Sequence, residues 1–310
     1  MIIEVENLVK RYGDVLALNH FNLQVEKGEI LGLLGPNGSG KSTSINCMLS
    51  LLNYEKGEIK LFGVPMRPDA YEVKKKIGVV MQDVAVFDEL TVYENIDYFC
   101  SLYIRDKRQR KEMVEAAISL VGLEDYKKMR PKKLSGGLLR RLNIACGIAH
   151  QPELIFLDEP TVAVDPQSRN RILENIKQLN AQGATIVYTT HYMEEVEQLC
   201  NRIVIMDEGK IIAMGTKEQL KAMIQTQEKI TFEIPDLDIS ILEELNRFSS
   251  IVKVNYLAPL LEIQVNRSKD ILVDLLDFFS QRNVEFHKVY SEKPSLNDVF
   301  LEITGKKLRD

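Results

Sequence analysis

Short apolar runs alternate with helical stretches from residue 29 to residue 215. Four of these runs are rich in branched apolar residues and are bounded by glycine or polar residues: 29–34, 77–81, 153–159 and 184–191. Continuous apolar runs of this length are typical of strands that are buried on both faces. Their alternation with helices predicts an α/β fold with a mostly parallel, covered sheet.

Between about residues 88 and 150 the pattern becomes helical. Thr91 is expected to cap the first helix of this segment, because a threonine hydroxyl accepts a hydrogen bond from the free backbone N–H groups of a first turn. The side chains predicted to face the core are Val92, Ile96 and Phe99 in that helix and Met113, Ala116, Ala117 and Leu120 in the next. A third helix is expected to follow the turn at 134–137.

The pattern changes again after Gly215. A connecting helix at 216–226 is followed by elements in the order strand, helix, strand, strand, helix, strand, the last strand being 284–290. This order is that of the ferredoxin-like split βαβ arrangement. We therefore expect two domains, residues 1–217 and an α+β domain at 218–310, with a last helix closing the chain.

Composition and charge describe an ordinary globular protein of 310 residues with a net charge of −5. That charge provides no overall attraction to nucleic acid or to anionic lipid, so we expect no nucleic-acid partner. The four cysteines lie about fifty residues apart, which favours free thiols over a metal site. No apolar stretch reaches the roughly 18 residues of a transmembrane helix, and no signal pattern is present. The expected location is cytoplasmic.

A glycine-rich turn links the predicted strand 29–34 to a predicted helix. It fits the phosphate-loop pattern G-x-x-x-x-G-K-[ST] and consists of Gly35, Pro36, Asn37, Gly38, Ser39, Gly40, Lys41, Ser42 and Thr43. Glycines let consecutive backbone N–H groups face phosphate oxygens, and the helix N-terminus adds its positive end. Lys41 is expected to contact the β- and γ-phosphates of a nucleotide and Ser42 to bind Mg²⁺.

Two carboxylates, Asp158 and Glu159, end the predicted strand 153–159. Ligand sites in open α/β sheets form at the carboxyl ends of the strands, and we expect this strand to lie directly beside 29–34. Asp158 would then hold Mg²⁺ opposite Ser42. Adjacent side chains on a strand point in opposite directions, so Glu159 is expected to face the γ-phosphate and orient water. Simple solvation of two acids at a strand end is the alternative.

A second glycine-rich turn, at Leu134, Ser135, Gly136 and Gly137, also opens a predicted helix. Such a turn is most often a helix cap, but it can also bind an anion through its backbone N–H groups. One triphosphate does not need two phosphate loops in one chain. The second turn therefore suggests that it serves another copy of the protein.

In their order and spacing these motifs resemble the ATPase subunit of an ABC transporter. Residues 35–43 are similar to its Walker A motif, 134–141 to its signature motif and 154–160 to its Walker B motif. Single positions that match the family are Tyr12 at the A-loop, Gln82 at the Q-loop, Asp165 at the D-loop and His191 at the switch histidine. The resemblance covers residues 1–215 and implies a P-loop NTPase sheet core with a helical subdomain at about 88–150.

The resemblance also implies a mechanism with ATP and Mg²⁺. Two subunits, identical or different, would pair head to tail, so that residues 35–43 of one and Ser135, Gly136 and Gly137 of the other enclose each ATP. Closure on ATP and reopening after hydrolysis would drive a separate transmembrane permease at the inner face of the cell membrane. The implied roles are water activation for Glu159, γ-phosphate contact for His191, dimer contact for Asp165, adenine stacking for Tyr12, and Mg²⁺ binding with permease coupling for Gln82.

Two positions depart from the family pattern. Leu138 stands where the family usually has glutamine, so a side-chain hydrogen bond is lost there. Ala163 stands where the family favours glycine, and it would strain the turn if that position needs a positive φ. Either change could slow turnover, and neither removes a catalytic group.

The end of the chain, PSLNDVFLEITGKKLR, is similar to that of ATPases in the drug-, antibiotic- and ion-export branch, which work with a separate permease. The C-terminal domain would then support dimerisation or permease contact, or only stabilise the fold. The alternatives to an exporter subunit are a soluble ABC ATPase of ribosomes or DNA, and a regulatory module that hydrolyses ATP weakly. The first usually has two cassettes or a long coiled coil, and neither is present.

Overall fold

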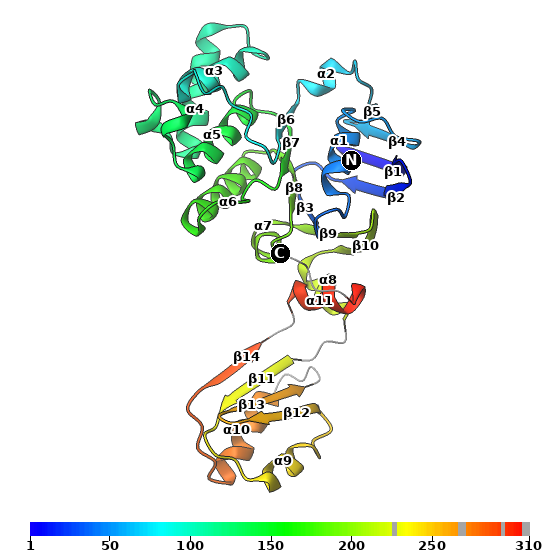
Figure 1. Ribbon diagram of the computed structural model, residues 1–310, viewed down its shortest axis with the longest axis vertical. Helices are drawn as coiled ribbons and strands as arrows, with labels where there is room; N and C mark the ends of the chain where they lie inside the picture. Colours follow the sequence, from blue (N-terminus) through cyan, green and yellow to red (C-terminus); the bar gives the residue numbers. More distant parts are fainter. Residues whose placement is uncertain (225–227, 266–270, 293–294, 306–310) are drawn as a thin grey trace. The chain divides into compact units, whose positions relative to one another are not determined.

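The computed structural model describes residues 1–224, 228–265, 271–292 and 295–305 (Figure 1). The chain divides into two compact units, residues 1–217 and the described residues from 218 to 305. Of the C-terminal stretch that resembles exporter ATPases, Pro294 and residues 306–309 lie outside the described residues.

A six-stranded sheet forms the centre of the first unit. Its strands, in spatial order, are β10 (Lys210–Gly215), β9 (Arg202–Asp207), β3 (Ile30–Leu34), β8 (Thr185–Thr190), β7 (Leu154–Asp158) and β6 (Ile77–Val80). All neighbours are parallel except β9 and β10. This confirms the predicted mostly parallel sheet, but the expectation that the acidic strand lies directly beside β3 was wrong. β8 separates β7 from β3, because β8 pairs with both.

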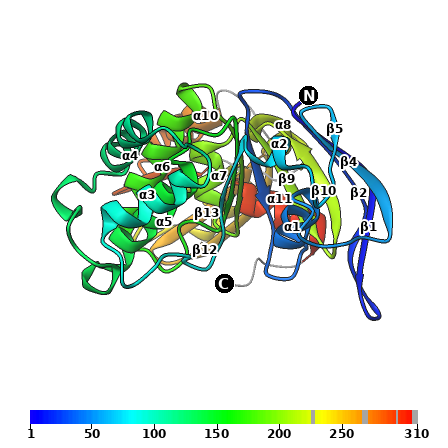
Figure 2. The same ribbon diagram turned by 90° about the horizontal axis from the view of Figure 1, so that it is seen from above.

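The same unit contains a second, antiparallel sheet, formed by strands from the first 65 residues. Its strands are β2 (Val15–Val25), β1 (Ile3–Tyr12), β4 (Lys56–Leu61) and β5 (Val64–Pro65), in that spatial order. Figure 2 shows α1 (Lys41–Met48) between the two sheets. Ile45 and Met48 of α1 pack there in one core with Leu33 of β3 and Leu61 of β4. The helix that follows the phosphate loop is thus held from two sides.

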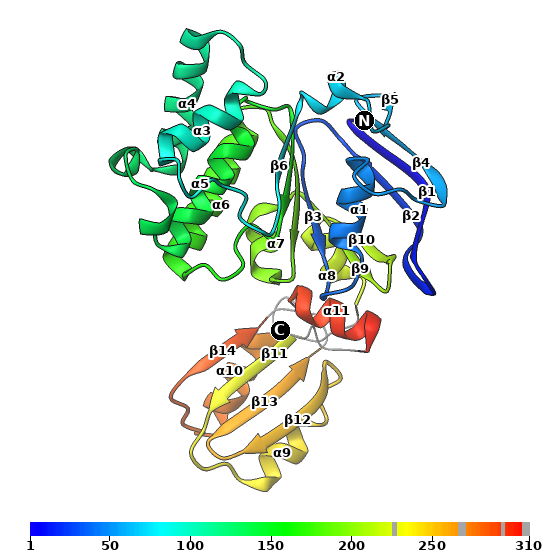
Figure 3. The ribbon, with the colours of Figure 1, turned by 45° about the horizontal axis from the view of Figure 1, so that its top comes forward.

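The other face and one end of the six-stranded sheet are covered by helices (Figures 2 and 3). The remaining helices of this unit are α2 (Tyr71–Lys74), α3 (Val92–Ser101), α4 (Lys107–Val121), the short 3₁₀ turns Glu124–Tyr126 and Pro131–Lys133, α5 (Gly136–Ile148), α6 (Pro166–Ala181) and α7 (Met193–Leu199). Thr91 caps α3 as predicted, in a capping box with Glu94.

The predicted core face of α4 was wrong. Its buried side chains are Val114, Ala117, Ile118 and Val121, whereas Ala116 is exposed. Both sets follow the helical spacing, so periodicity alone does not choose between them. Packing of α4 against α3 and α5 selects the stripe rotated by one residue.

The second unit is an antiparallel sheet with helices on one face (Figure 3). The strands lie in the order β12 (Ile251–Leu257), β13 (Leu260–Val265), β11 (Glu228–Glu233) and β14 (Val289–Glu292). With α9 (Ile239–Leu245) after β11 and α10 (Ile271–Gln281) after β13, this is the predicted ferredoxin-like arrangement. The last strand begins at Val289 and not at residue 284 as expected. α8 (Lys217–Ala222) and α11 (Leu296–Thr304) complete the described elements.

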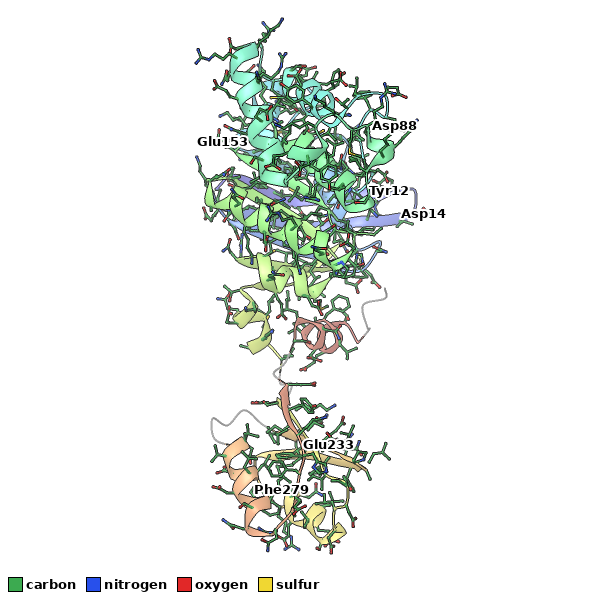
Figure 4. The ribbon with its side chains drawn as sticks, turned by 90° about the vertical axis from the view of Figure 1, so that its left-hand side faces the viewer. Tyr12, Asp14, Asp88, Glu153, Glu233 and Phe279 are labelled. Carbon is green, nitrogen blue, oxygen red and sulfur yellow. The ribbon has the colours of Figure 1, made fainter. Side chains whose placement is uncertain are left out.

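The core of the second unit is aromatic, with Phe279 of α10 against Phe232 of β11 at 4.8 Å between ring centroids. Figure 4 shows Phe279 and Glu233 in this unit. Glu233 follows Phe232 and is partly exposed, because alternate residues of a strand face opposite sides of the sheet. Within the described ranges, no helix is long and apolar enough to cross a membrane.

Candidate functional site

The turn after β3 requires glycine at two positions. A Cβ on Gly35 would lie 2.3 Å from the backbone oxygen of Met206, and one on Gly40 would lie 2.7 Å from that of Ala17. Gly40 also has a φ of +103°, which side chains rarely allow. The turn is therefore held close to neighbouring backbone, in the form that a phosphate-binding loop needs.

Gly40 precedes the first residue of α1, so no side chain caps this helix in the described structure. The first N–H groups of a helix have no partner within the helix, and they carry its positive end. Ser42 and Thr43, in the first turn of α1, are half-buried. The residues present thus fit a phosphate group at the start of α1.

Lys41, the first residue of α1, is 4% exposed. Its Nζ donates hydrogen bonds to the carbonyl oxygens of Gly35 at 2.8 Å and Pro36 at 3.2 Å, and it lies 3.3 Å from Oε1 of Glu159. Burial lowers the pKa of Lys41, while the charges of Glu159 and Asp158 act in the opposite direction. These carboxylates favour the charged form of the ammonium group, and burial favours the neutral form.

Asp158 and Glu159 end β7 as predicted, but a third residue determines how they are held. Thr189 of β8 is fully buried, and its Oγ1 donates to Oδ1 of Asp158 at 2.5 Å. The same Oγ1 accepts a hydrogen bond from the backbone N–H of Glu159 at 2.9 Å. Sequence analysis missed Thr189; the available signal was a hydroxyl residue in a buried strand, two positions before His191.

The backbone of Glu159 is in the left-handed region, with a φ of +46°. For a residue with a side chain this conformation costs free energy, and such residues cluster at functional sites. It turns the carboxylate of Glu159, which is 5% exposed, toward both Lys41 and His191. Nδ1 of His191 lies 3.2 Å from its Oε2. The structure therefore brings together Lys41, Asp158, Glu159 and His191.

Two other predicted site residues are more exposed. Gln82 follows β6, and its side chain is exposed while its carbonyl oxygen accepts a hydrogen bond from Arg140 at 2.6 Å. Tyr12 ends β1 and is 48% exposed, with Nζ of Lys10 5.1 Å from its ring centroid. Figure 4 shows it next to Asp14, at the turn between β1 and β2.

The second glycine-rich turn opens α5, and Ser135 caps that helix by accepting from the N–H of Leu138. Gly136 is exposed, with no atom closer than 4.0 Å to a Cβ built on it. Gly137 is buried, and a Cβ there would lie 2.2 Å from Oγ of Ser168. Gly137 therefore packs against the start of α6, while Gly136 remains exposed.

Asp165 caps α6 and accepts a hydrogen bond from the N–H of Ser168 at 2.9 Å. This backbone hydrogen bond lowers the pKa of Asp165. Two residues earlier, Ala163 has a φ of +59°. Position 163 thus needs the conformation in which glycine is favoured, and alanine is strained there.

In the described part of the chain, no group of three or more His, Cys, Asp or Glu side chains could hold a metal ion. In a Mg²⁺ site of the nucleotide type, phosphate oxygens and water supply most ligands and the protein adds one or two. One carboxylate oxygen of Asp158 accepts a hydrogen bond from Thr189, and Ser42 is the second residue of α1. These residues fit the ion.

Comparison with known proteins shows to which family this chain belongs. A model described as "ABC transporter" matches residues 18–162, and one described as "ATP-binding protein DrrA1-3-like, C-terminal domain" matches residues 215–304. The linearmycin resistance ATP-binding protein LnrL of Bacillus subtilis is 36% identical over 311 residues, 100% of each chain. The chain belongs to the ABC transporter family. It is an ATP-binding subunit with the ATPase fold of that family.

Other members of the ABC transporter family are similar over nearly the full length. The daunorubicin resistance ATP-binding protein DrrA3 of Streptomyces coeruleorubidus is 32% identical and covers 98% of this chain and 96% of its own. The Nod factor export ATP-binding protein I of Burkholderia orbicola is 33% identical, with 99% and 98% covered. Among solved structures, a dimeric ATP-binding cassette, MJ0796, bound to ADP and Pi has a TM-score of 0.63 at 28% identity, covering 69% of this chain and 98% of its own.

Proposed function

We propose that this protein is the ATP-hydrolysing subunit of an ABC exporter, which dimerises on ATP and drives a separate transmembrane permease. One observation carries the proposal. At the carboxyl ends of β3, β7 and β8, the carboxylate of Glu159 lies 3.3 Å from Nζ of Lys41 and 3.2 Å from Nδ1 of His191. Residues 1–217 would be the ATPase domain, with a helical subdomain at about 88–150. Residues 218–310 would be the accessory domain.

The phosphate loop would bind the phosphates of Mg-ATP, and polar side chains around it would bind the metal ion. Backbone N–H groups of residues 35–43 and the ammonium of Lys41 would bind the β- and γ-phosphates. Ser42, Asp158 and Gln82 would hold Mg²⁺ directly or through water. The ion would supply charge neutralisation on the phosphates. The exposed ring of Tyr12 offers a stacking surface for adenine.

The hydrolysis step would rest on Glu159 and His191. The carboxylate of Glu159 points into the site from a strained backbone and would polarise the attacking water. His191 lies beside it and would contact the γ-phosphate. Thr189 would keep both acids of β7 in place through its one hydroxyl group.

Dimerisation is supported by the openness of the second turn. Ser135 and Gly136 are exposed, and Gly137 fixes the turn against α6. In the dimer these residues of one subunit would close over the ATP of the other, with Asp165 at the interface. The similar cassette structure is dimeric, which supports pairing of two subunits.

A permease partner and the direction of transport are supported by the relatives and by one surface. Relatives over the whole chain are called resistance or export proteins. Five residues after Gln82 in the chain, the ring of Phe87 is in edge contact with that of Tyr98 at 4.9 Å between centroids, and both residues are 43% exposed. Such an exposed aromatic pair suits a protein partner. The subunit would then be peripheral at the cytoplasmic face of the membrane.

The test is a pull-down with Glu159→Gln, purified with ATP from the solubilised membranes of its own cells. Loss of the general base should lower turnover by about 100-fold or more and keep ATP bound, so that the closed dimer and its partner accumulate. Lys41→Ala, which should bind ATP more weakly and accumulate less of the closed dimer, is the matched control. A polytopic membrane protein in stoichiometric amount supports the proposal. Ribosomal or DNA-associated proteins instead would favour the soluble alternative, and unchanged turnover would contradict the role of Glu159.

A further inference from the structure

Arg140 lies in the second turn of α5, five residues after Ser135, and is 4% exposed. Its guanidinium has five N–H donors, and all five are used. Nε donates to the carbonyl oxygen of Pro160 at 2.8 Å, Nη1 to those of Met81 at 3.1 Å and Gln82 at 2.6 Å, and Nη2 to those of Glu159 at 2.6 Å and Asp158 at 3.4 Å.

These acceptors belong to two segments that leave the sheet side by side. The ladder between β6 and β7 ends at the pair of Val80 and Leu157. The carbonyl groups that follow have no partner in that ladder, and a buried carbonyl without a hydrogen bond is costly. The side chain of Arg140 donates hydrogen bonds to carbonyl groups of both segments, where the β6–β7 ladder supplies none.

Arg140 is bound by carbonyl oxygens, and within the described residues no carboxylate is in ion-pair contact with it. Burial lowers the pKa of Arg140, whereas Tyr188 and the carboxylates of Asp158, Asp83 and Glu159 raise it. A guanidinium stays charged in proteins, so a fixed positive charge lies behind the two acids of β7. Its hydrogen bonds are of the strong, charge-assisted kind.

Fixing these carbonyls fixes the direction of catalytic side chains. The peptide planes on both sides of Glu159 are held by hydrogen bonds to Arg140, and between them its backbone has the φ of +46° that aims the carboxylate. The bond to the Gln82 carbonyl does the same at the end of β6. Both segments are thereby tied to α5, the helix that begins at Ser135, Gly136 and Gly137.

We propose that Arg140 is a positioning residue for ATP hydrolysis: by holding the backbone of residues 158–160 and of Gln82 together, it sets Glu159 at the γ-phosphate and Gln82 at the Mg²⁺ site, and connects them to the helix that carries the second glycine-rich turn. This inference rests on the proposed ATPase function. It assigns no contact between Arg140 and the nucleotide.

The experiment compares Arg140→Lys with Arg202→Lys in the full chain. Lysine keeps the charge and length but cannot span two segments with a fixed fork of donors. Arg202, the first residue of β9, lies outside all the motifs and also joins two positions, because it donates to the carbonyl oxygen of Gln24 and to the carboxylate of Glu29. Arg140→Lys should lower kcat by about 10- to 100-fold, the cost of a misplaced catalytic group, and leave KM within about threefold.

Two further measurements separate positioning from a general loss of structure. The Tm and the Kd for a fluorescent ATP analogue should change no more in Arg140→Lys than in Arg202→Lys. In a Glu159→Gln background, Arg140→Lys should have little further effect on the single-turnover rate, because two residues that act through one group are not additive. If the lysine variant does not fold, Arg140→Gln, with two donors and no buried charge, is measured by the same criteria.

A kcat within about twofold of the wild type, an equal loss in Arg202→Lys, or an undiminished further effect in the Glu159→Gln background would overturn the inference. Wild-type protein without ATP turnover would instead overturn the proposed function. Active wild type with an unaffected Arg140→Lys variant refutes only the role of Arg140.

Discussion

The two glycine-rich turns of this protein look alike in sequence, since each opens a helix, but their surroundings differ. The first lies before α1, and Lys41 at its end is buried 3.3 Å from the carboxylate of Glu159. The second lies before α5, where Gly136 is exposed and Ser135 uses its hydroxyl to cap its own helix.

On our proposal, this difference makes the first turn a phosphate site in itself and the second turn one part of a site shared by two subunits. α1 has no side-chain cap in the described structure, so its first N–H groups are available to an anion, with a cation and two acids around them. The turn before α5 presents backbone and one hydroxyl group, and in the proposed dimer the other subunit would bring the phosphates to it. Four changes test this comparison, from the largest expected effect to the smallest.

Lys41→Ala should remove the only ammonium group that we place at the phosphates. ATP binding should weaken by about 10- to 100-fold, since hydrogen bonds to charged groups contribute about 1.5–3 kcal/mol, and turnover should fall at least as much. Calorimetry measures the binding. Lys27→Ala, an exposed lysine that pairs with Glu153, is the control and should bind ATP normally. Normal binding by Lys41→Ala would contradict the assignment of the first turn.

Gly136→Asp should separate binding from turnover. The fold has room for a side chain at this position, since no atom lies closer than 4.0 Å to a Cβ there. A carboxylate on the second turn would repel the phosphates held by the other subunit. We expect turnover to fall by about 100-fold, or 2.7 kcal/mol, with ATP affinity of the monomer unchanged. Size-exclusion chromatography in ATP should show loss of the dimer; full turnover would mean that the second turn is a helix cap and no more.

Thr189→Val keeps the shape of a buried side chain and removes the hydroxyl that holds Asp158 and Glu159. Turnover should fall by about tenfold, the value of one charge-assisted hydrogen bond, and the Mg²⁺ concentration for half-maximal rate should rise. Thr185→Val is the matched control, because Thr185 is equally buried on the same strand and accepts from the N–H of Gly28, away from the acids. Equal effects of the two variants would show that Thr189 has only a structural role.

Ala163→Gly should relieve the backbone at a φ of +59° near the second turn. The gain is about 0.5–1 kcal/mol, because about 1–2 kcal/mol of strain is offset by the extra freedom of glycine in the unfolded chain. Differential scanning calorimetry should show a Tm higher by about 2 °C. Gln151→Gly, at a φ of +52° after α5, should gain similar stability. Turnover should rise, by about twofold, only in Ala163→Gly.

Much of the site could be predicted from local pattern. Glycine spacing before Lys41 identified the phosphate loop, because few backbone paths allow close contact with an anion and they need glycine. Thr91 was identified as a cap for the similarly local reason that a first turn lacks acceptors for its N–H groups. The six elements of the second unit followed from periodicity, and their ferredoxin-like order is confirmed.

Other features depend on contacts between distant segments, and no local pattern contains them. β8 lies between β3 and β7, so that Thr189 reaches Asp158 and Glu159. The buried face of α4 is chosen by its neighbours, because two overlapping stripes had the same period.

By itself, the sequence determined which residues could bind phosphate and in which order helices and strands follow one another, since both depend on neighbouring residues and the backbone. Only the tertiary structure decided which strand lies beside which, the aim of Glu159 and the five hydrogen bonds of Arg140. Those features depend on packing and on the need of each buried polar group for a partner, which the folded chain satisfies across segments far apart in sequence.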